Sequence, residues 1–318
     1  MALALAVLSV LSLFIGAIDL TPIFRGDTQY LFLLFISRVP RLLAILCTGV
    51  GMSVAGLIMQ QLCMNKFVSP TTGATISSAQ FGIMLSLVFF TGTSLFQRTA
   101  LAFACAMIGT WIYVWMIQRI KVKDMVMVPL IGIMFGSVIS GFTSYFALEA
   151  GVTQSLSGYL VGSFALIIQG RYEIVFLVLP LILLAYIFAN HFNIVGMGEN
   201  FANNLGVNYN VVLFLGLSIA ALITASIVVV VGSISYIGLI VPNAVAMFRG
   251  DKIRNSLLDV SIFGALFVLI CDVIGRLVIH PYELPIDLIS GILGSAIFLV
   301  LMFKRLAPPK AKKAEVAK

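Results

Sequence analysis

Apolar residues fill most of the chain in long runs that short polar breaks separate. A run of about 20 mostly apolar residues can cross a bilayer as a helix. The pattern predicts ten spans, near residues 2–19, 42–63, 74–92, 99–118, 125–147, 173–190, 211–231, 236–248, 257–279 and 285–303. The eighth is short, so we expect a broken or tilted helix packed inside the protein. Residues 155–168 are apolar but also too short, and we expect a surface or half-inserted helix there.

The longest interior polar break is residues 192–210, which read FNIVGMGENFANNLGVNYN. Apolar side chains spaced by three and four would line one face of a helix there: Ile194, Met197, Phe201 and Leu205. Gly206 stands where a helix commonly ends in a left-handed cap. One interpretation is a short amphipathic helix that lies against the membrane surface and serves a partner. The other is a polar loop that only links two spans.

Composition identifies the class of protein. Hydrophobic residues make up 61% and charged residues 10% of the 318 residues, whereas a soluble domain is about 25% charged. The chain is therefore predicted to be an all-α polytopic membrane protein, with one transmembrane domain over residues 1–306 and a basic tail over 307–318. The first twenty residues lack the basic start and cleavage site of a signal peptide, so we expect them to form the first span.

Basic residues predict the orientation. If the N-terminus is inside, the even number of spans puts the C-terminus inside as well. With this orientation, 13 of the 19 Lys and Arg residues fall in the inner loops and the C-terminal tail. Such an inner excess is what the positive-inside rule requires, so the net charge of +7 indicates a membrane and not a nucleic acid. The outer basic residues are all Arg: Arg25, Arg38, Arg41, Arg98, Arg171 and Arg276. They could pair with carboxylates of an acidic partner, or simply anchor helix ends at the headgroups.

Catalytic chemistry has little support in this sequence. It contains no phosphate-binding loop and no zinc-protease motif, and its four Cys lie singly in apolar runs. Asp272 and Arg276, four residues apart near an outer helix end, are predicted to pair on one helix face. No acid falls in the middle of a predicted span, which disfavours an ion-coupled secondary transporter. Transport is therefore the leading class of function, with an ion-coupled carrier disfavoured and a membrane-embedded enzyme as the alternative from another class.

Small residues predict how the helices pack. The second span contains CTGVGMSVAGLIMQQ (47–61), and small side chains let membrane helices approach closely. Gln60 and Gln61 at its end could line a pathway or make an interhelical hydrogen bond. The run GSISYIG (232–238) breaks the helix between the seventh and eighth spans. AGLIM (55–59) and IGLIV (237–241) echo each other weakly, as the halves of an inverted repeat would.

Four motifs, in order between residues 38 and 303, resemble those of the permeases of iron-siderophore and vitamin B12 ABC importers. They are RVPRL (38–42) with AGLIMQQ (55–61) and NKFVSP (65–70); GENFANNLG (198–206); GSISYIGLIVPN (232–243); and Asp272, Gly275-Arg276 and YELP (282–285). SPTTGATISS (69–78) resembles the branch that carries ferric catecholate and related siderophores. Three residues depart from the family pattern: Ser233 replaces Pro, Asn243 replaces His, and Lys66 replaces an apolar residue.

The resemblance implies a type II ABC importer permease fold with about ten spans and an inverted repeat, in the inner (cytoplasmic) membrane. It implies a second permease subunit, identical or different, and ATPase subunits that bind the ATP. It also implies a solute-binding protein that delivers a ferric siderophore. The iron stays chelated in such a system, so no cofactor and no metal ligands are expected on this chain.

Residue roles carry over from the same motifs. Docking of the binding protein is implied for Arg38, Arg41 and Arg276. Coupling to the ATPase is implied for Glu199, Ala202, Asn203 and Gly206. The residues expected at the pathway or gate are Gln60, Gln61, Asn65, Ser69, Pro70, Gly238 and Pro242.

Overall fold

The computed structural model describes residues 1–16, 32–90, 94–120, 126–170, 172–249 and 253–306. The predicted basic tail over 307–318 and the outer Arg25 and Arg171 lie outside these residues. Throughout the described part the regular structure is helical: α1 (Ala2–Phe14), α3 (Val39–Leu62), α4 (Thr75–Phe89), α5 (Leu95–Arg119), α6 (Met127–Glu149), α7 (Thr153–Leu160), α8 (Val178–Ile187), α9 (Ala189–Val195), α10 (Glu199–Asn204), α11 (Tyr209–Val231), α12 (Ile237–Arg249), α13 (Ile253–Leu277) and α14 (Ile286–Leu306).

Every predicted span contains a helix, which confirms the all-α membrane class. Among the described residues six helices are long and apolar enough to cross a bilayer, and the pair that bends by 60° where α8 meets α9 would make a seventh span if it crosses as one unit. The remaining three predicted spans are the shorter apolar helices α1, α4 and α12. At 1.5 Å per residue, the 13 residues of α1 extend only about 20 Å, less than the roughly 30 Å of hydrocarbon.

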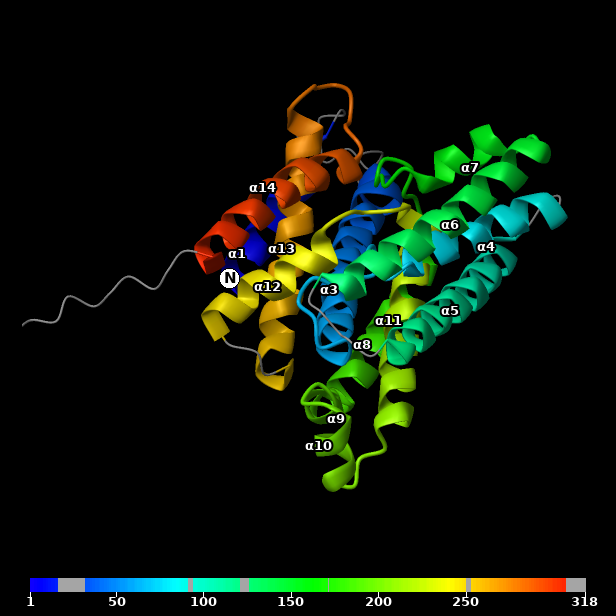
Figure 1. The fold of residues 1–318 in the computed structure, drawn as a ribbon. Helices are drawn as coiled ribbons and strands as arrows, with labels where there is room; N and C mark the ends of the chain where they lie inside the picture. Colours follow the sequence, from blue (N-terminus) through cyan, green and yellow to red (C-terminus); the bar gives the residue numbers. More distant parts are fainter. Residues whose placement is uncertain (17–31, 91–93, 121–125, 171, 250–252, 307–318) are drawn as a thin grey trace, which may run out of the picture.

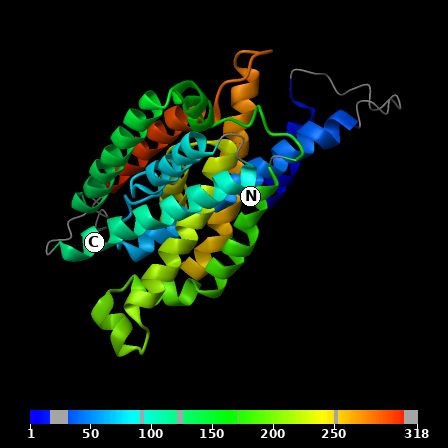
Figure 2. The ribbon, with the colours of Figure 1, turned by 90° about the vertical axis from the view of Figure 1, so that its right-hand side faces the viewer.

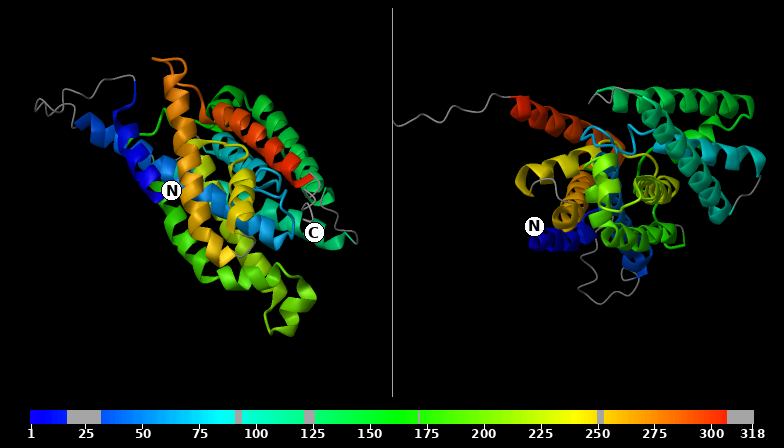
Figure 3. Two further views of the ribbon diagram at one scale, coloured as in Figure 1. Left: turned by 90° about the vertical axis from the view of Figure 1, so that its left-hand side faces the viewer. Right: turned by 60° about the horizontal axis from the view of Figure 1, so that its bottom comes forward.

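Helices α3 and α11 form the centre of the bundle. Most of each membrane-crossing window is buried, 72% for α3 with the π-helical turn η2 (Leu34–Arg38) that precedes it and 78% for α11. Helices α4, α5 and α6 lie on one side of this pair, and α12, α13 and α14 on the other (Figure 1). Helix α1 lies along α13 (Figure 3, left). The windows of α6 and α14 are only 28% and 22% buried, so both helices expose broad apolar faces.

Small residues bring the central helices together, as predicted. A Cβ added at Gly49 of α3 would lie 2.5 Å from the carbonyl oxygen of Gly264 in α13. One added at Gly56 would lie only 2.0 Å from the carbonyl oxygen of Gly238 in α12. The two glycines of the AGLIM and IGLIV echo therefore face each other across the α3–α12 contact.

The prediction of one amphipathic helix over 192–210 is wrong. Helix α9 ends at Val195 and α10 begins at Glu199, because Gly198 between them has φ +110°. A helical period counted through this corner has no physical meaning. The predicted apolar face is accordingly exposed at Met197, Phe201 and Leu205, whereas Phe192, Val195 and Ala202 are buried. The left-handed cap at Gly206 is confirmed by its φ of +74°.

The helix expected over 155–168 is correct only in its first half, since α7 ends at Leu160. The chain then runs beside the turn between α11 and α12, where Ser163 N donates to Val231 O (2.9 Å) and Ser233 N donates to Leu160 O (3.1 Å). These bonds replace those that a continued helix would have made.

The two ends of the bundle carry different features. Helices α9 and α10 project from one end, which we call the α10 end, while the connection between α13 and α14 projects from the opposite end (Figures 1 and 2). The break at residues 192–210 follows the sixth predicted span and the α13–α14 connection follows the ninth, so an inner N-terminus would put them on opposite sides of the membrane. They lie at opposite ends of the molecule (Figure 1).

Candidate functional site

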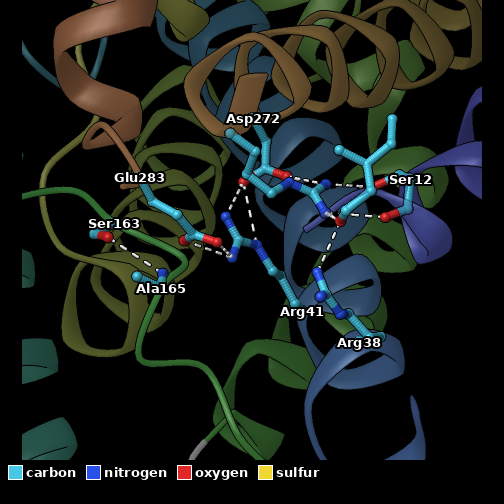
Figure 4. Close-up of polar contacts among 9 residues, drawn as sticks. Ser12, Arg38, Arg41, Ser163, Ala165, Asp272 and Glu283 are labelled. Carbon is cyan, nitrogen blue, oxygen red and sulfur yellow. Dashed lines mark hydrogen bonds and ion pairs between the residues drawn. The ribbon is translucent and has the colours of Figure 1, made fainter. Parts of the chain in front are cut away.

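Four charged side chains meet at the end opposite to α10, and we call them the ionic cluster: Arg41, Asp272, Arg276 and Glu283 (Figure 4). Arg41 comes from the first turns of α3, Asp272 and Arg276 from the last turns of α13, and Glu283 from the connection to α14. The cluster therefore joins helices from both ends of the sequence.

Arg41 is held by two carboxylates. Its Nη2 and Nε donate to Asp272 Oδ1 at 2.7 and 3.3 Å, and its Nη1 donates to the two oxygens of Glu283 at 2.9 and 2.8 Å. Arg276 Nη2 binds the other oxygen of Asp272. The predicted pairing of Asp272 with Arg276 on one helix face is thus confirmed, and Asp272 bridges two guanidinium groups.

The end of α1 completes the surroundings of the cluster. Arg276 Nη1 donates to the carbonyl oxygens of Ser12 (2.9 Å) and Ile15 (2.6 Å). Arg38 Nη1 donates to the same Ile15 oxygen at 2.7 Å. The three arginines expected to dock a partner are therefore gathered where the end of α1 meets α3 and α13; Figure 4 labels Arg38 and Arg41 among them.

Burial distinguishes this cluster from an exposed docking patch. Arg41 is 8%, Asp272 4% and Arg276 3% exposed. Buried charges must be paired, because an isolated one costs several kcal/mol of desolvation. In this conformation Arg41 and Arg276 bind oxygen atoms of this chain, and their docking of a partner stays a prediction.

A cavity of about 310 Å³ opens at the α10 end, and four of the predicted pathway residues line it: Gln60, Gln61, Asn65 and Pro242. Gly196, at the corner between α9 and α10, lines it too. The side-chain amide of Gln60 also donates to the carbonyl oxygens of Gly238 and Leu239, both at 3.2 Å. The interhelical hydrogen bond of Gln60 is thus confirmed; Gln60 also lines a cavity, and its role in a pathway stays a prediction.

The other predicted pathway residues form the joint behind this cavity. Ser69 N donates to Thr72 Oγ1 at 2.8 Å, which closes a turn before α4. A Cβ added at Gly238 would lie 3.0 Å from Cδ of Pro70, so the loop packs against the start of α12. Ser69, Pro70 and Gly238 thus position helices and do not line the cavity.

Helix α10 presents a mixed surface at its own end of the bundle. Of the residues expected to couple to a partner, Glu199, Asn203 and Gly206 are exposed, whereas Ala202 is fully buried against the bundle. Ala202 therefore anchors the helix, and the exposed carboxylate and amide are left available for contact.

Two departures from the family pattern have structural explanations. Ser233 N donates to Leu160 O, a bond that proline could not make because it has no N–H. The Asn243 amide donates to Lys66 O (2.8 Å) and Leu239 O (2.7 Å), and so ties α12 to the loop that precedes α4.

Sequence reasoning left Glu283 and Asp287 out of the expected sites. Asp287 Oδ1 accepts a hydrogen bond from Ser235 N at 2.8 Å and joins the start of α14 to the turn before α12. The sequence did contain a sign that Glu283 belongs to this site, because Glu283 lies in the YELP motif shortly after the predicted pair of Asp272 and Arg276. For Asp287, a helix-start position gave no sign of a distant partner.

Comparison with known proteins identifies the family and supports the fold. Residues 4–304 match the FecCD transport family. The petrobactin import system permease protein YclN of Bacillus subtilis is 43% identical over 95% of this chain and 96% of its own length. The ferric-anguibactin transport system permease protein FatD of Vibrio anguillarum is 38% identical over 84% and 85%. A solved metal-chelate type ABC transporter in an inward-facing conformation has a TM-score of 0.82 and 27% identity, covering 95% and 97% of the two chains.

Proposed function

This chain belongs to the FecCD transport family, and we propose that it is the permease subunit of an ATP-driven importer that takes up a ferric siderophore. The observation that carries the proposal is the match over nearly the whole chain to permeases named for petrobactin and ferric-anguibactin import. The chain is a transport subunit and not an enzyme. The ion-coupled alternative is set aside, because the family is that of ABC importer permeases, whose ATP is bound by a separate subunit.

Petrobactin is the first substrate to test, since two relatives that carry its name are 43% and 37% identical to this chain. A strain that lacks this gene should lose uptake of radio-iron from ferric petrobactin and regain it with the gene on a plasmid. Uptake should also stop when the partner ATPase is inactivated. Undiminished uptake in the deletion strain would refute the substrate, and uptake without ATPase activity would refute the powered mechanism.

For the end opposite to α10, we propose that it faces outside and docks the loaded binding protein through Arg38, Arg41 and Arg276. The convergence of three guanidinium groups at this end supports the proposal, because carboxylates on a partner would be their natural ligands. Replacing each of the three by Glu should abolish docking and uptake. Normal docking by a correctly assembled variant would show that the arginines serve another purpose.

For the α10 end, we propose an inside location and contact with the ATPase through Glu199, Ala202, Asn203 and Gly206. Glu199→Arg reverses an exposed charge and should uncouple ATP hydrolysis from uptake. Gly206→Pro should do so as well, since proline cannot adopt the left-handed φ of this cap. Asn210→Arg is the control, because it introduces the same arginine side chain at an exposed position in the first turn of α11, with a charge change of one instead of two. Equal coupling in Glu199→Arg and Asn210→Arg would exclude a role for Glu199.

The proposed assembly has two permease subunits, identical or different, in the cytoplasmic membrane with both termini inside. The sparsely buried α6 and α14 offer apolar faces for the second subunit and for lipid. A cysteine placed at the exposed Asn203 should react with a thiol reagent only after the reagent enters the cell. Labelling by an impermeant reagent in intact cells would reverse the orientation.

A further inference from the structure

The two carboxylates of the ionic cluster have different environments. The Asp272 side chain is 3% exposed and uses one oxygen for each of two arginines. The Glu283 side chain is 24% exposed, and both of its oxygens lie on the same nitrogen of Arg41. Asp272 is therefore built into the core of the cluster, whereas Glu283 closes it from the rim.

Glu283 stands on a projecting connection. The segment between α13 and α14 exposes Val278, Ile279 and Tyr282, the last by 75%, and it forms the tip of the bundle in Figure 1. Leu284 N donates to Gly275 O at 3.0 Å and fixes the base of the segment. The Glu283 side chain can thus leave Arg41 while this anchor and the buried core stay in place.

All three nitrogens of Arg41 already bind carboxylates of this chain. Asp272 holds Nε and Nη2, and Glu283 holds Nη1. A carboxylate that arrives from outside meets the Nη1 edge only at the place where Glu283 lies, because Asp272 on the other edge is buried. A carboxylate that takes the N–H groups of Nη1 must therefore displace Glu283, whose two oxygens bind that nitrogen.

We propose that Glu283 is an internal latch, which occupies the edge of Arg41 that a carboxylate of the binding protein takes on docking. The inference rests on the proposed docking role of Arg41. Docking exchanges one carboxylate for another on Arg41, so the new ion pair adds little net affinity. The apparent affinity for the binding protein equals the affinity of the open form multiplied by the fraction of molecules in which the latch is open. A binding protein that lacks a suitably placed carboxylate cannot open the latch.

Opening the latch also has a route into the bundle. Glu283 precedes the start of α14 by three residues, and Asp287 in the first turn of α14 holds Ser235 in the turn between α11 and α12. Glu283 is thus connected through the start of α14 to the turn that leads into α12. Docking outside is in this way linked to helices that run through the bundle.

The test measures the affinity of the loaded binding protein encoded with this permease for the purified permease–ATPase complex in lipid nanodiscs. Glu283→Gln keeps the shape of the side chain and removes its charge. It should bind tighter by the inverse of the open fraction; a gain of about fivefold corresponds to a latch that is closed about four-fifths of the time in the unmodified complex. Glu149→Gln, which removes an exposed acid at the end of α6, is the matched control and should bind like the unmodified complex.

Arg41→Ala separates the latch from the docking role on which it rests. Loss of docking in Arg41→Ala, together with unchanged or weaker docking in Glu283→Gln, overturns the latch and leaves the docking role intact. Unchanged docking in Arg41→Ala overturns both. Should Glu283→Gln fail to assemble, Glu283→Asp, which keeps the charge but is too short to hold Arg41 with both oxygens, must show the same direction of change.

Discussion

Replacing Gly56 with alanine tests the contact between α3 and α12. The new Cβ would lie 2.0 Å from the carbonyl oxygen of Gly238 and 2.5 Å from its carbonyl carbon and Cα. All three are backbone atoms, so no change of side-chain rotamer relieves the overlap. Real Cβ atoms essentially never come within 3.0 Å of another atom. The two helices must therefore separate locally by about 1 Å, because a tightly packed interior has no spare room for the added methyl group.

The energetic consequence follows from two opposing terms. Overpacking of a dense interior costs about 1–3 kcal/mol, and alanine gains up to about 1 kcal/mol over glycine in helix propensity. The separation also stretches the hydrogen bonds from Gln60 to Gly238 and Leu239, which are already 3.2 Å long. We therefore expect a net loss of about 1–2 kcal/mol in the free energy of unfolding.

The assay is thermal unfolding of the detergent-purified protein, followed by size-exclusion chromatography of the material that stays folded. Gly291→Ala is the matched control, because Gly291 also lies inside a helix but its added Cβ meets no atom within 4 Å. Gly291→Ala should be as stable as the unmodified protein or more so. If Gly56→Ala unfolds at the same temperature as Gly291→Ala, the close α3–α12 contact is not formed as described.

Three further changes probe other contacts. Asp272→Asn leaves two guanidinium groups buried without their shared carboxylate, and breaking such a pair costs about 3–5 kcal/mol, so the same unfolding assay should show a larger loss than for any glycine variant. Ser233→Pro deletes the donor to Leu160, and an acceptor left unsatisfied costs about 1–3 kcal/mol; unchanged unfolding would argue against that bond. In Gly198→Ala the new Cβ meets no atom, but the alanine must adopt φ +110°, which costs about 1–3 kcal/mol of strain. This variant should reduce ATP-driven uptake. Gly158→Ala is the control and should leave uptake unchanged, because its Cβ also meets no atom and its φ is not positive.

The sequence alone was sufficient for the class of protein, the approximate positions of the membrane helices and the family. The bilayer sets the length of an apolar run, so spans can be read without any tertiary contact. The pairing of Asp272 with Arg276 was also predictable, because both lie one turn apart on the same helix. Close packing at Gly56 followed from the run of small residues, since only such residues let membrane helices touch.

Only the tertiary structure decided which charged side chains pair with one another and which face of α10 is exposed. Arg41 and Glu283 are separated by 242 residues in the sequence, and no periodicity relates side chains on different helices. The exposed face of α10 depends on the backbone angle of Gly198, which glycine adopts freely and a sequence pattern does not reveal. Local spacing thus determined the helices, while long-range contacts determined which side chains are buried together and which face a partner.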